Sequence, residues 1–160
     1  MADQSTLGLS ANLTGQVAIV TGASRGLGRA SAIVLARNGA KVACIARDAE
    51  KLSETVAEIT GLGGQVEAFA CDVQDRKSID VLVDRICAEW GRLDILVNNA
   101  GVTRDTLLPR MSDEQWDDVI STNLTGAFLF ARAASRHMMM AKYGRIINMA
   151  SVTGIIGNAG

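Results

Sequence analysis

The glycine-rich segment at residues 21–28, Thr-Gly-Ala-Ser-Arg-Gly-Leu-Gly, constrains the fold more than any other feature. It follows residues 17–20, which are apolar on both faces, as a strand must be when helices cover both sides of a parallel sheet. A helical stretch comes next and ends near Gly39, a residue type that readily adopts the left-handed conformation closing a helix. A glycine turn between a buried strand and a helix predicts a site for an anionic ligand, because the first N–H groups of the helix are free to bind it.

The alternation of strand and helix continues along the chain. Apolar runs predict further strands at residues 42–46, 66–70, 93–97 and 145–149. Helices are expected from the N-cap Asp48, with Leu52, Val56 and Ile59 on one face, over residues 79–90, and after a capping box at Ser112 and Gln115. The pattern predicts an α/β fold, a Rossmann-type doubly wound parallel sheet with helices on both faces, truncated after the fifth strand.

Length and composition fit one domain. The chain has 160 residues, 48% of them hydrophobic, which is enough for one core. We expect the domain over residues 15–160, incomplete at its C-terminus, after a flexible leader at residues 1–14. Sixteen Lys and Arg against seventeen Asp and Glu give a net charge of −1, which disfavours a nucleic-acid partner.

The sequence gives little support for a disulfide framework, a metal site, a signal peptide or a membrane span. Three cysteines, an odd number without CxxC spacing, and a single histidine indicate neither a disulfide framework nor a metal site. The first residues lack the basic and apolar pattern of a signal peptide, so a cytoplasmic location is expected. The apolar residues 124–140 are interrupted by Arg132, Arg136 and His137, so no membrane-spanning helix is expected.

The three glycines of the turn have distinct expected roles. Gly22 permits the tight turn, Gly26 lets the backbone approach a pyrophosphate, and Gly28 allows close packing of the helix. An ordinary glycine-rich turn without a ligand is the alternative interpretation.

The end of the second expected strand bears on the choice of dinucleotide. Domains that bind NAD usually place a carboxylate there, about 20 residues after the glycines, for the ribose hydroxyls. This chain has Ala46 and then Arg47, and a guanidinium suits a 2′-phosphate. Arg25 could supply a second positive charge, so NADP is favoured over NAD. The alternative is that Arg47 is a solvated residue at the start of a helix that Asp48 caps.

Three motifs together resemble the short-chain dehydrogenase/reductase family: the glycine turn, Asn-Asn-Ala-Gly at residues 98–101, and Ser151 after the fifth expected strand. Residues 98–105, 117–126 and 143–148 are most similar to its 3-oxoacyl-[acyl-carrier-protein] reductase branch. The resemblance implies an NADP-dependent oxidoreductase of fatty acid biosynthesis, within lipid metabolism. The implied cofactor-binding residues are Thr21, Gly22, Ser24, Arg25, Gly26, Leu27, Gly28, Arg47, Asp72, Val73, Asn99, Ala100 and Gly101.

Several of these positions also have purely structural explanations. The resemblance implies that Asp72, beside Val73, contacts the adenine ring, but Asp72 could equally be an exposed loop carboxylate or a helix cap. Asn98 and Asn99 could bond to backbone groups and tie the turn to neighbouring strands, and both interpretations can hold together.

The resemblance also implies a catalytic set. Ser151 would donate a hydrogen bond to the substrate carbonyl, and Asn123 would hold a water and shape its helix for a proton relay. The proton source of the family is a Tyr-x-x-x-Lys pair, expected beyond Gly160, so residues 1–160 alone are expected to be inactive. Tyr143 is followed by Gly144, Arg145 and two isoleucines, which leaves it a turn or interface residue.

The implied activity is the reduction of a 3-oxoacyl thioester on an acyl carrier protein by NADPH, in a full-length protein that is commonly a tetramer. Lys142 and Arg136 are candidates for docking the acidic carrier, or else cations that complement the end of a helix. A catalytically inactive nucleotide-binding module and a short-chain reductase for another ketone or alcohol are the alternatives. A methyltransferase on a similar sheet is disfavoured by residues 98–101.

Overall fold

Five parallel strands form the centre of the protein in the computed structural model, which describes residues 11–157. The strands are β1 (Val17–Thr21), β2 (Lys41–Ala46), β3 (Gln65–Ala70), β4 (Ile95–Asn98) and β5 (Arg145–Asn148). Their order in the sheet is β3-β2-β1-β4-β5. The strand order reverses between β1 and β4, and such reversals create a crevice at the carboxyl ends of the strands. The predicted doubly wound parallel sheet is confirmed.

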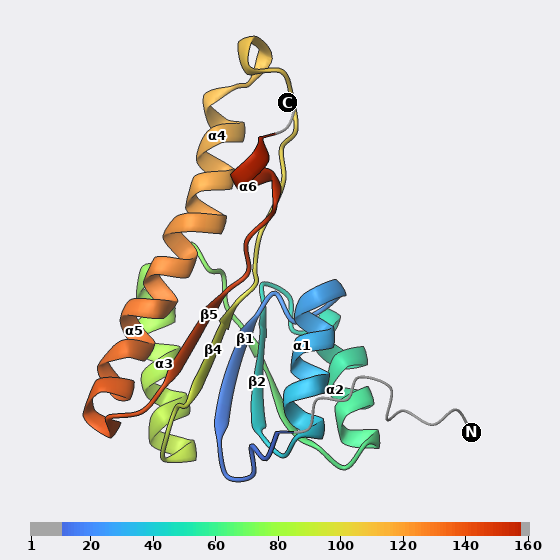
Figure 1. Cartoon of the computed structure of the whole chain (residues 1–160), viewed down its shortest axis with the longest axis vertical. Helices are drawn as coiled ribbons and strands as arrows, with labels where there is room; N and C mark the ends of the chain where they lie inside the picture. Colours follow the sequence, from blue (N-terminus) through green and yellow to red (C-terminus); the bar gives the residue numbers. More distant parts are fainter. Residues whose placement is uncertain (1–10, 158–160) are drawn as a thin grey trace.

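Helices cover the sheet on both faces, as Figure 1 shows. The helical segments are α1 (Gly26–Arg37), η1 (Glu50–Leu52), α2 (Ser53–Gly61), α3 (Arg76–Trp90), η2 (Leu108–Arg110), α4 (Asp113–Val119), η3 (Ile120–Thr125), α5 (Gly126–Ala141) and α6 (Thr153–Ile156). Helices α1 and α2 lie on one face, and α3 and α5 on the other.

Alternating residues of β1, β2, β3 and β4 supply two separate cores. In β1, Val17 and Ile19 pack with α3 and α5, whereas Ala18 and Val20 pack with α1 and α2. All four side chains are buried, which explains why this strand is apolar on both faces. The two cores hold β1 from both faces and so fix its carboxyl end, from which the glycine turn leaves the sheet.

The second helical region begins differently from the expectation. Asp48 accepts a hydrogen bond from the Glu50 N–H at 3.0 Å, but the N-cap of the 3-10 turn η1 is Ala49, and α2 begins only at Ser53 with Leu52 as its N-cap. Thr55 is fully buried where Val56 was expected, and its hydroxyl donates to the Ala23 carbonyl at 3.0 Å. The expectation that Val56 faces the core was wrong, because it counted apolar residues only, and a threonine whose hydroxyl is hydrogen-bonded can also be buried in a core.

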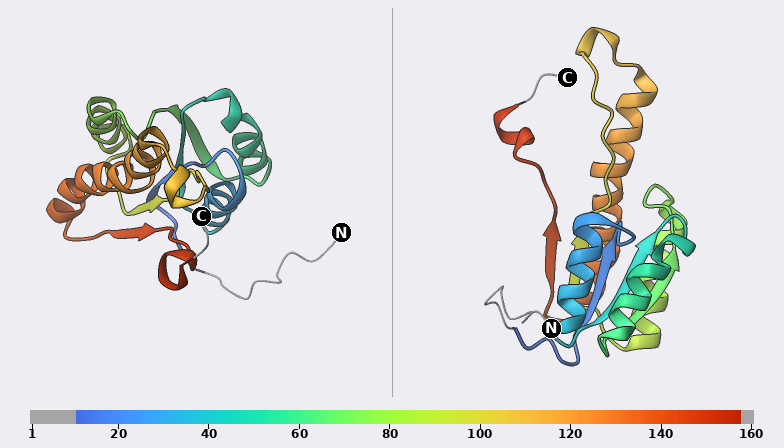
Figure 2. Two further views of the ribbon diagram at one scale, coloured as in Figure 1. Left: turned by 90° about the horizontal axis from the view of Figure 1, so that it is seen from above. Right: turned by 90° about the vertical axis from the view of Figure 1, so that its right-hand side faces the viewer.

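Helix α4, the π-helical turn η3 and helix α5 follow one another without a break and extend beyond the sheet (Figures 1 and 2). The π turn was not predicted, because one inserted residue leaves little trace in an apolar repeat. It widens the helix at Thr122 and Asn123, next to the carboxyl ends of the strands.

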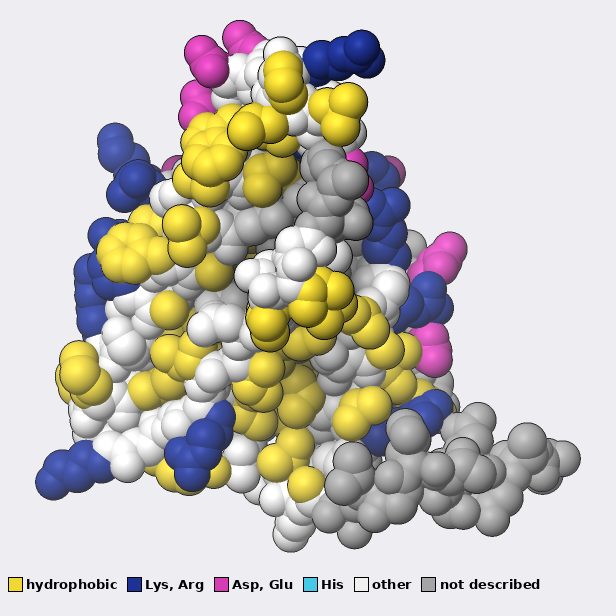
Figure 3. All heavy atoms as spheres, turned by 45° about the horizontal axis from the view of Figure 1, so that its top comes forward, with side chains coloured by type: hydrophobic (Ala, Val, Ile, Leu, Met, Phe, Trp, Pro, Cys, Tyr) yellow, Lys and Arg dark blue, Asp and Glu magenta, His cyan; other side chains and the backbone are white. Residues whose placement is uncertain are grey.

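Strand β5 forms one edge of the sheet, and all four of its residues are exposed. Large exposed hydrophobic side chains also lie on α4, η3 and α5, among them Trp116, Leu124 and Phe128. Figure 3 shows hydrophobic side chains spread widely over one face of the molecule. Surfaces of this extent are typical of proteins that associate. Across residues 11–157, no helix has the length and hydropathy needed to cross a membrane.

Residues 1–10 of the predicted leader lie outside the described residues. Residues 11–14 are bonded to the domain: the N–H of Leu13 donates to the Asn38 carbonyl at 2.8 Å, and the N–H of Ala11 donates to the Asn38 side chain at 2.9 Å.

Candidate functional site

A cavity of about 520 Å³ opens at the carboxyl ends of the strands, where the strand order reverses. Eleven of the thirteen residues expected to bind a cofactor line it: Gly22, Ser24, Arg25, Gly26, Leu27, Arg47, Asp72, Val73, Asn99, Ala100 and Gly101. The other two, Thr21 and Gly28, are buried behind its wall. The fold therefore brings the expected set together from four separate segments of the chain.

The glycine turn adopts backbone conformations that side chains disfavour. Gly22 has a φ of 66° and Gly26 a φ of 56°, both in the left-handed region. A Cβ at residue 28 would overlap the Gly22 carbonyl and the Asn99 side chain. A Cβ at residue 26, in contrast, meets no described atom within 4 Å, because it faces the open cavity. Gly28 is thus required by packing, whereas Gly26 leaves room for a ligand to approach the backbone.

Thr21 and Asn99 join the glycine turn to the segment after β4. The Thr21 hydroxyl accepts hydrogen bonds from the N–H groups of Asn99 and Ala100, each at 3.0 Å. The Asn99 amide donates to the carbonyl groups of Thr21 at 3.1 Å and Gly22 at 3.3 Å. Asn98 lies deeper and donates to Ala127 and Asn148. These bonds confirm the structural interpretation of the two asparagines.

Helix α1 starts at the cavity without a side-chain cap. Its N-cap is Arg25, whose side chain accepts no hydrogen bond, and its first turn has no acidic residue. In α3 and α4, by comparison, Asp75 and Ser112 accept hydrogen bonds from the first-turn N–H groups. The first N–H groups of α1 therefore remain available, and with the helix dipole they favour an anion in the cavity.

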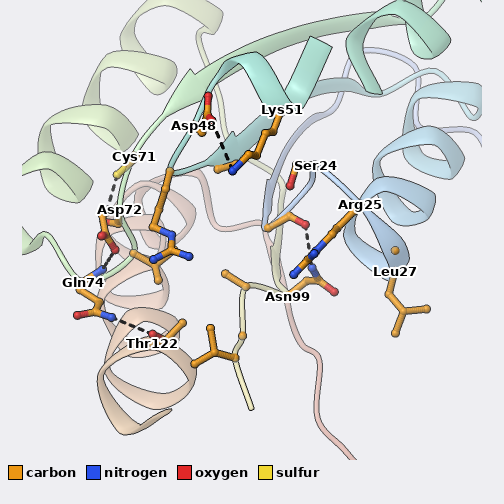
Figure 4. Close-up of a pocket in the computed structure, with 18 residues that line it drawn as sticks. Ser24, Arg25, Leu27, Asp48, Lys51, Cys71, Asp72, Gln74, Asn99 and Thr122 are labelled. Carbon is orange, nitrogen blue, oxygen red and sulfur yellow. Dashed lines mark hydrogen bonds and ion pairs between the residues drawn. The ribbon is translucent and has the colours of Figure 1, made fainter. Parts of the chain in front are cut away.

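Two guanidinium groups line this cavity without an ionic partner. Neither Arg25 nor Arg47 forms an ion pair or a side-chain hydrogen bond within residues 11–157. Both side chains are exposed, and in Figure 4 Arg25 extends from the glycine turn into the cavity. Ala46, which lines the cavity at the end of β2, carries no carboxylate. The local charge is therefore suited to a phosphate group.

The opposite wall comes from the loop after β3 and from the π turn (Figure 4). The carboxylate of Asp72 accepts a hydrogen bond from the Gln74 N–H at 2.9 Å, so this residue also shapes its own loop. The Gln74 amide donates to the Thr122 hydroxyl at 2.9 Å, which links the loop to the π turn. Gln74 and Thr122 line the cavity but were not predicted, since only the folded chain brings residues 48 positions apart together.

The two expected catalytic residues lie apart from one another. The side chain of Asn123 accepts from the Val102 N–H at 2.8 Å and donates to the Val102 carbonyl at 2.9 Å. Ser151 is exposed, and its hydroxyl bonds with the Thr153 hydroxyl at 2.7 Å. No hydrogen bond joins Asn123 to Ser151 in the described part of the chain. Asn123 lies in η3 and Ser151 follows β5, and neither residue lines the cavity.

The basic residues of α5 divide into two groups. Arg132, Arg136 and His137 face carboxylates of α3, with Arg136 Nη1 at 3.9 Å from Asp80 and His137 Nε2 at 2.7 Å from Asp84. Lys142, at the end of α5, has no ion-pair partner among residues 11–157, and it adopts a φ of 51°. Of the two predicted docking residues, Lys142 is therefore free to attract an acidic partner, and Arg136 is only weakly engaged.

Tyr143 and the cysteines offer no catalytic group near the cavity. Tyr143 precedes β5, so it lies at the amino ends of the parallel strands, whereas the cavity lies at their carboxyl ends. The Arg145 guanidinium lies 5.2 Å from the centre of the Tyr143 ring. Burial raises the pKa of the Cys44 thiol to about 12 and the pKa values of Cys71 and Cys87 to about 11. Cys71 lines the cavity, but the raised pKa values keep all three thiols protonated at neutral pH, which disfavours a role as a nucleophile.

Known proteins resemble this chain over most of its length. A family model described as short chain dehydrogenase matches residues 16–160. The 3-oxoacyl-[acyl-carrier-protein] reductase FabG of Escherichia coli (strain K12) is 47% identical over 149 residues, 93% of this chain and 60% of the relative. The corresponding reductase of Synechocystis sp. is 48% identical, covering 92% of this chain and 60% of its own. The chain thus spans about 60% of the length of these relatives.

A solved structure agrees with the fold. The crystal structure of a metagenomic short-chain oxidoreductase in complex with NADP superposes with a TM-score of 0.86 and 44% identity. The match covers 90% of this chain and 66% of that protein. The fold described above is therefore shared with a short-chain oxidoreductase of known structure.

Proposed function

This chain belongs to the short-chain dehydrogenase family, an oxidoreductase family, and from that premise we propose that the protein reduces a 3-oxoacyl thioester on an acyl carrier protein with NADPH. Arg25 and Arg47, which line the cavity and have no ionic partner among residues 11–157, carry the cofactor part of the proposal. The relatives of about 47% identity, named as 3-oxoacyl-[acyl-carrier-protein] reductases, support the substrate part.

The cavity residues fit a dinucleotide phosphate. The uncapped start of α1 and the open space above Gly26 suit the pyrophosphate, because the backbone N–H groups there can donate to its oxygens. Asp72 and Val73 offer an acceptor and an apolar surface for the adenine. The segment from Asn99 to Gly101 closes the same cavity with small residues.

The choice of NADPH over NADH follows from charge. A 2′-phosphate monoester carries between one and two negative charges at neutral pH, and two free guanidinium groups line the cavity at Arg25 and Arg47. Ala46 offers no carboxylate to bind the ribose hydroxyls of NAD. The similar short-chain oxidoreductase crystallised with NADP agrees with this choice.

The chain's own residues would assist the reaction as follows. NADPH, when bound, supplies the hydride. The Ser151 hydroxyl would donate to the carbonyl oxygen, where negative charge develops during reduction. Asn123 holds the Val102 backbone with two hydrogen bonds and so positions the segment that closes the cavity. Family resemblance implies that a Tyr-x-x-x-Lys pair supplies the proton. Tyr143 does not suit this role, because it lies at the amino end of β5, whereas the cavity lies at the carboxyl ends of the strands.

An acidic carrier protein would dock through local basic residues. Lys142, which follows α5, is the stronger candidate, because no described carboxylate pairs with it, and Arg136 on α5 is the second. We also propose that the protein acts in the cytoplasm as a tetramer. The exposed hydrophobic side chains of α5 support association between copies.

Turnover by the natural full-length protein tests this proposal. We expect oxidation of NADPH with acetoacetyl thioesters, faster on the acyl carrier protein than on coenzyme A. The variant Ser151→Ala should lower kcat about a hundredfold or more. The matched variant Thr153→Ala should keep most of the activity, although the two hydroxyls are bonded to each other. Cofactor binding without turnover of any ketone would indicate an inactive nucleotide-binding module, and turnover restricted to other ketones would indicate a different short-chain reductase.

A further inference from the structure

A third cation, Lys51, shares the main cavity with Arg25 and Arg47. It lies in the 3-10 turn η1, which follows the end of β2, and its side chain is largely exposed. In Figure 4, Lys51 and Asp48 extend from this turn along one side of the cavity. No glycine motif or strand ending points to Lys51 in the sequence, because its place depends on the unexpected 3-10 turn.

A neighbouring cavity of about 450 Å³ makes this position distinctive. Ser24, Arg25, Asp48 and Lys51 line both cavities, so they stand where the two meet. Of these four, Arg25 and Lys51 are positive and Asp48 is negative. An anionic group bound beside Arg25 would therefore lie near the Lys51 ammonium as well as near the Asp48 carboxylate.

The pairing between Lys51 and Asp48 is weak. Lys51 Nζ lies 3.6 Å from Asp48 Oδ2, beyond the usual length of a charge-assisted hydrogen bond. The other carboxylate oxygen, Oδ1, already accepts the Glu50 N–H at 3.0 Å. Both side chains are accessible to solvent, and exposed pairs of this kind contribute little to stability. The ammonium can thus turn from Asp48 to a bound phosphate at low cost.

We propose that Lys51 is a specificity-determining residue that, with Arg25 and Arg47, binds the 2′-phosphate of the cofactor. The inference rests on the proposed NADPH-dependent function and names a further ligand within it. The cavity is lined by three cations, Arg25, Arg47 and Lys51, and by two carboxylates, Asp48 and Asp72, which leaves an excess of one positive charge. Without Lys51, the two carboxylates would cancel the charge that Arg25 and Arg47 offer to the phosphate.

Binding of adenine nucleotides tests this role without any catalytic step. The natural full-length protein is titrated with adenosine 2′,5′-bisphosphate and with 5′-AMP, which differ only in the 2′-phosphate. The variant Lys51→Met keeps the aliphatic chain and removes the charge. We expect the Kd of the bisphosphate to rise about tenfold, and the Kd of 5′-AMP to change less than about twofold. Lys51→Arg should restore the wild-type Kd of the bisphosphate within about threefold, because it keeps the positive charge.

Two controls separate a direct role from a general one. Lys77 is an exposed lysine at the start of α3 that does not line either cavity, so Lys77→Met should leave both Kd values unchanged. The penalty of Lys51→Met should persist in a protein that also carries Asp48→Asn, because the ammonium acts on the phosphate itself. Thermal unfolding and circular dichroism identify any variant that is misfolded.

Three results would overturn the role of Lys51: an unchanged bisphosphate Kd in Lys51→Met, an equal loss for 5′-AMP, or disappearance of the penalty in the Asp48→Asn background. The proposed function fails in a different way. If the wild-type protein does not distinguish the bisphosphate from 5′-AMP, preference for NADPH is wrong. If it does distinguish them and Lys51→Met distinguishes them to the same extent, only the role of Lys51 is wrong.

Discussion

Asn99 donates two hydrogen bonds to Thr21: its backbone N–H donates to the Thr21 hydroxyl at 3.0 Å, and its side-chain amide donates to the Thr21 carbonyl at 3.1 Å. Thr21 is the last residue of β1 and Asn99 directly follows β4, so the two residues are 78 positions apart in the sequence. This pair fixes the floor of the cavity, because the glycine turn and the segment closing the cavity cannot move independently.

Removing the Thr21 hydroxyl should therefore loosen the site. Thr21 is buried, and Thr21→Val keeps its shape but leaves the N–H groups of Asn99 and Ala100 without their acceptor. We expect the free energy of unfolding in urea to fall by about 2 kcal/mol and NADPH binding to weaken. Thr21→Ser keeps the hydroxyl and should lose clearly less of both. Equal losses in the two variants would show that the methyl group matters more than the hydrogen bonds.

Gly28 should tolerate no side chain. In Gly28→Ala, the new Cβ would overlap the Gly22 carbonyl and the Asn99 amide, so the turn must shift. We expect a loss of about 1 to 3 kcal/mol in the free energy of unfolding, together with weaker NADPH binding. Gly61→Ala in α2 is the matched control, since a Cβ there meets no described atom within 4 Å. Its stability should be unchanged or slightly higher. A Gly28→Ala protein with wild-type stability and affinity would contradict the packing role.

Arg47 should control the preference between the two nicotinamide cofactors. Loss of a charge-assisted hydrogen bond to a phosphate costs about 1.5 to 3 kcal/mol, so Arg47→Ala should weaken NADPH binding about tenfold to a hundredfold. The affinity for NADH should stay within about twofold, because that cofactor lacks the phosphate. Arg37, an exposed residue at the end of α1, lies outside the cavity, and Arg37→Ala is the control. Fluorescence titration measures all four affinities; parallel losses for both cofactors would refute the role of Arg47.

The buried thiols should make stability depend on alkaline pH. The pKa of the Cys44 thiol is about 12 in the folded chain, against an ordinary value of 9.0. A thiol with a raised pKa stabilises the fold below its ordinary pKa, and this stabilisation is lost as the pH rises toward the folded value. The free energy of unfolding should therefore fall as the pH rises above 9.0. Cys44→Ala should fall less steeply in urea unfolding, and an identical slope would contradict the effect of burial.

Much of this fold could be predicted from local patterns. The apolar strands, the glycine turn and the carboxylate-free end of β2 depend on neighbouring residues, and the structure has them where they were expected. The π turn at Thr122 and Asn123 could not be predicted, because one inserted residue leaves little trace in an apolar repeat and its hydrogen bonds to Gln74 and Val102 join segments far apart in the sequence.

The ion pairs of the basic side chains on α5 also could not be predicted, because their partners come from another segment of the chain. Arg132, Arg136 and His137 look like a free basic stripe in the sequence, yet Asp80 and Asp84 of α3 lie opposite them in the fold. Sequence spacing shows which side chains share a helix face, but it does not show which helix packs against that face.

The relative affinity of the natural full-length protein for NADPH and NADH tests the central claim most directly. The guanidinium groups of Arg25 and Arg47, which no carboxylate of the described residues pairs with, predict that NADPH binds at least about tenfold more tightly in a fluorescence titration at low salt. Equal affinities, or tighter binding of NADH, would contradict the account of this cavity as a site for a 2′-phosphate.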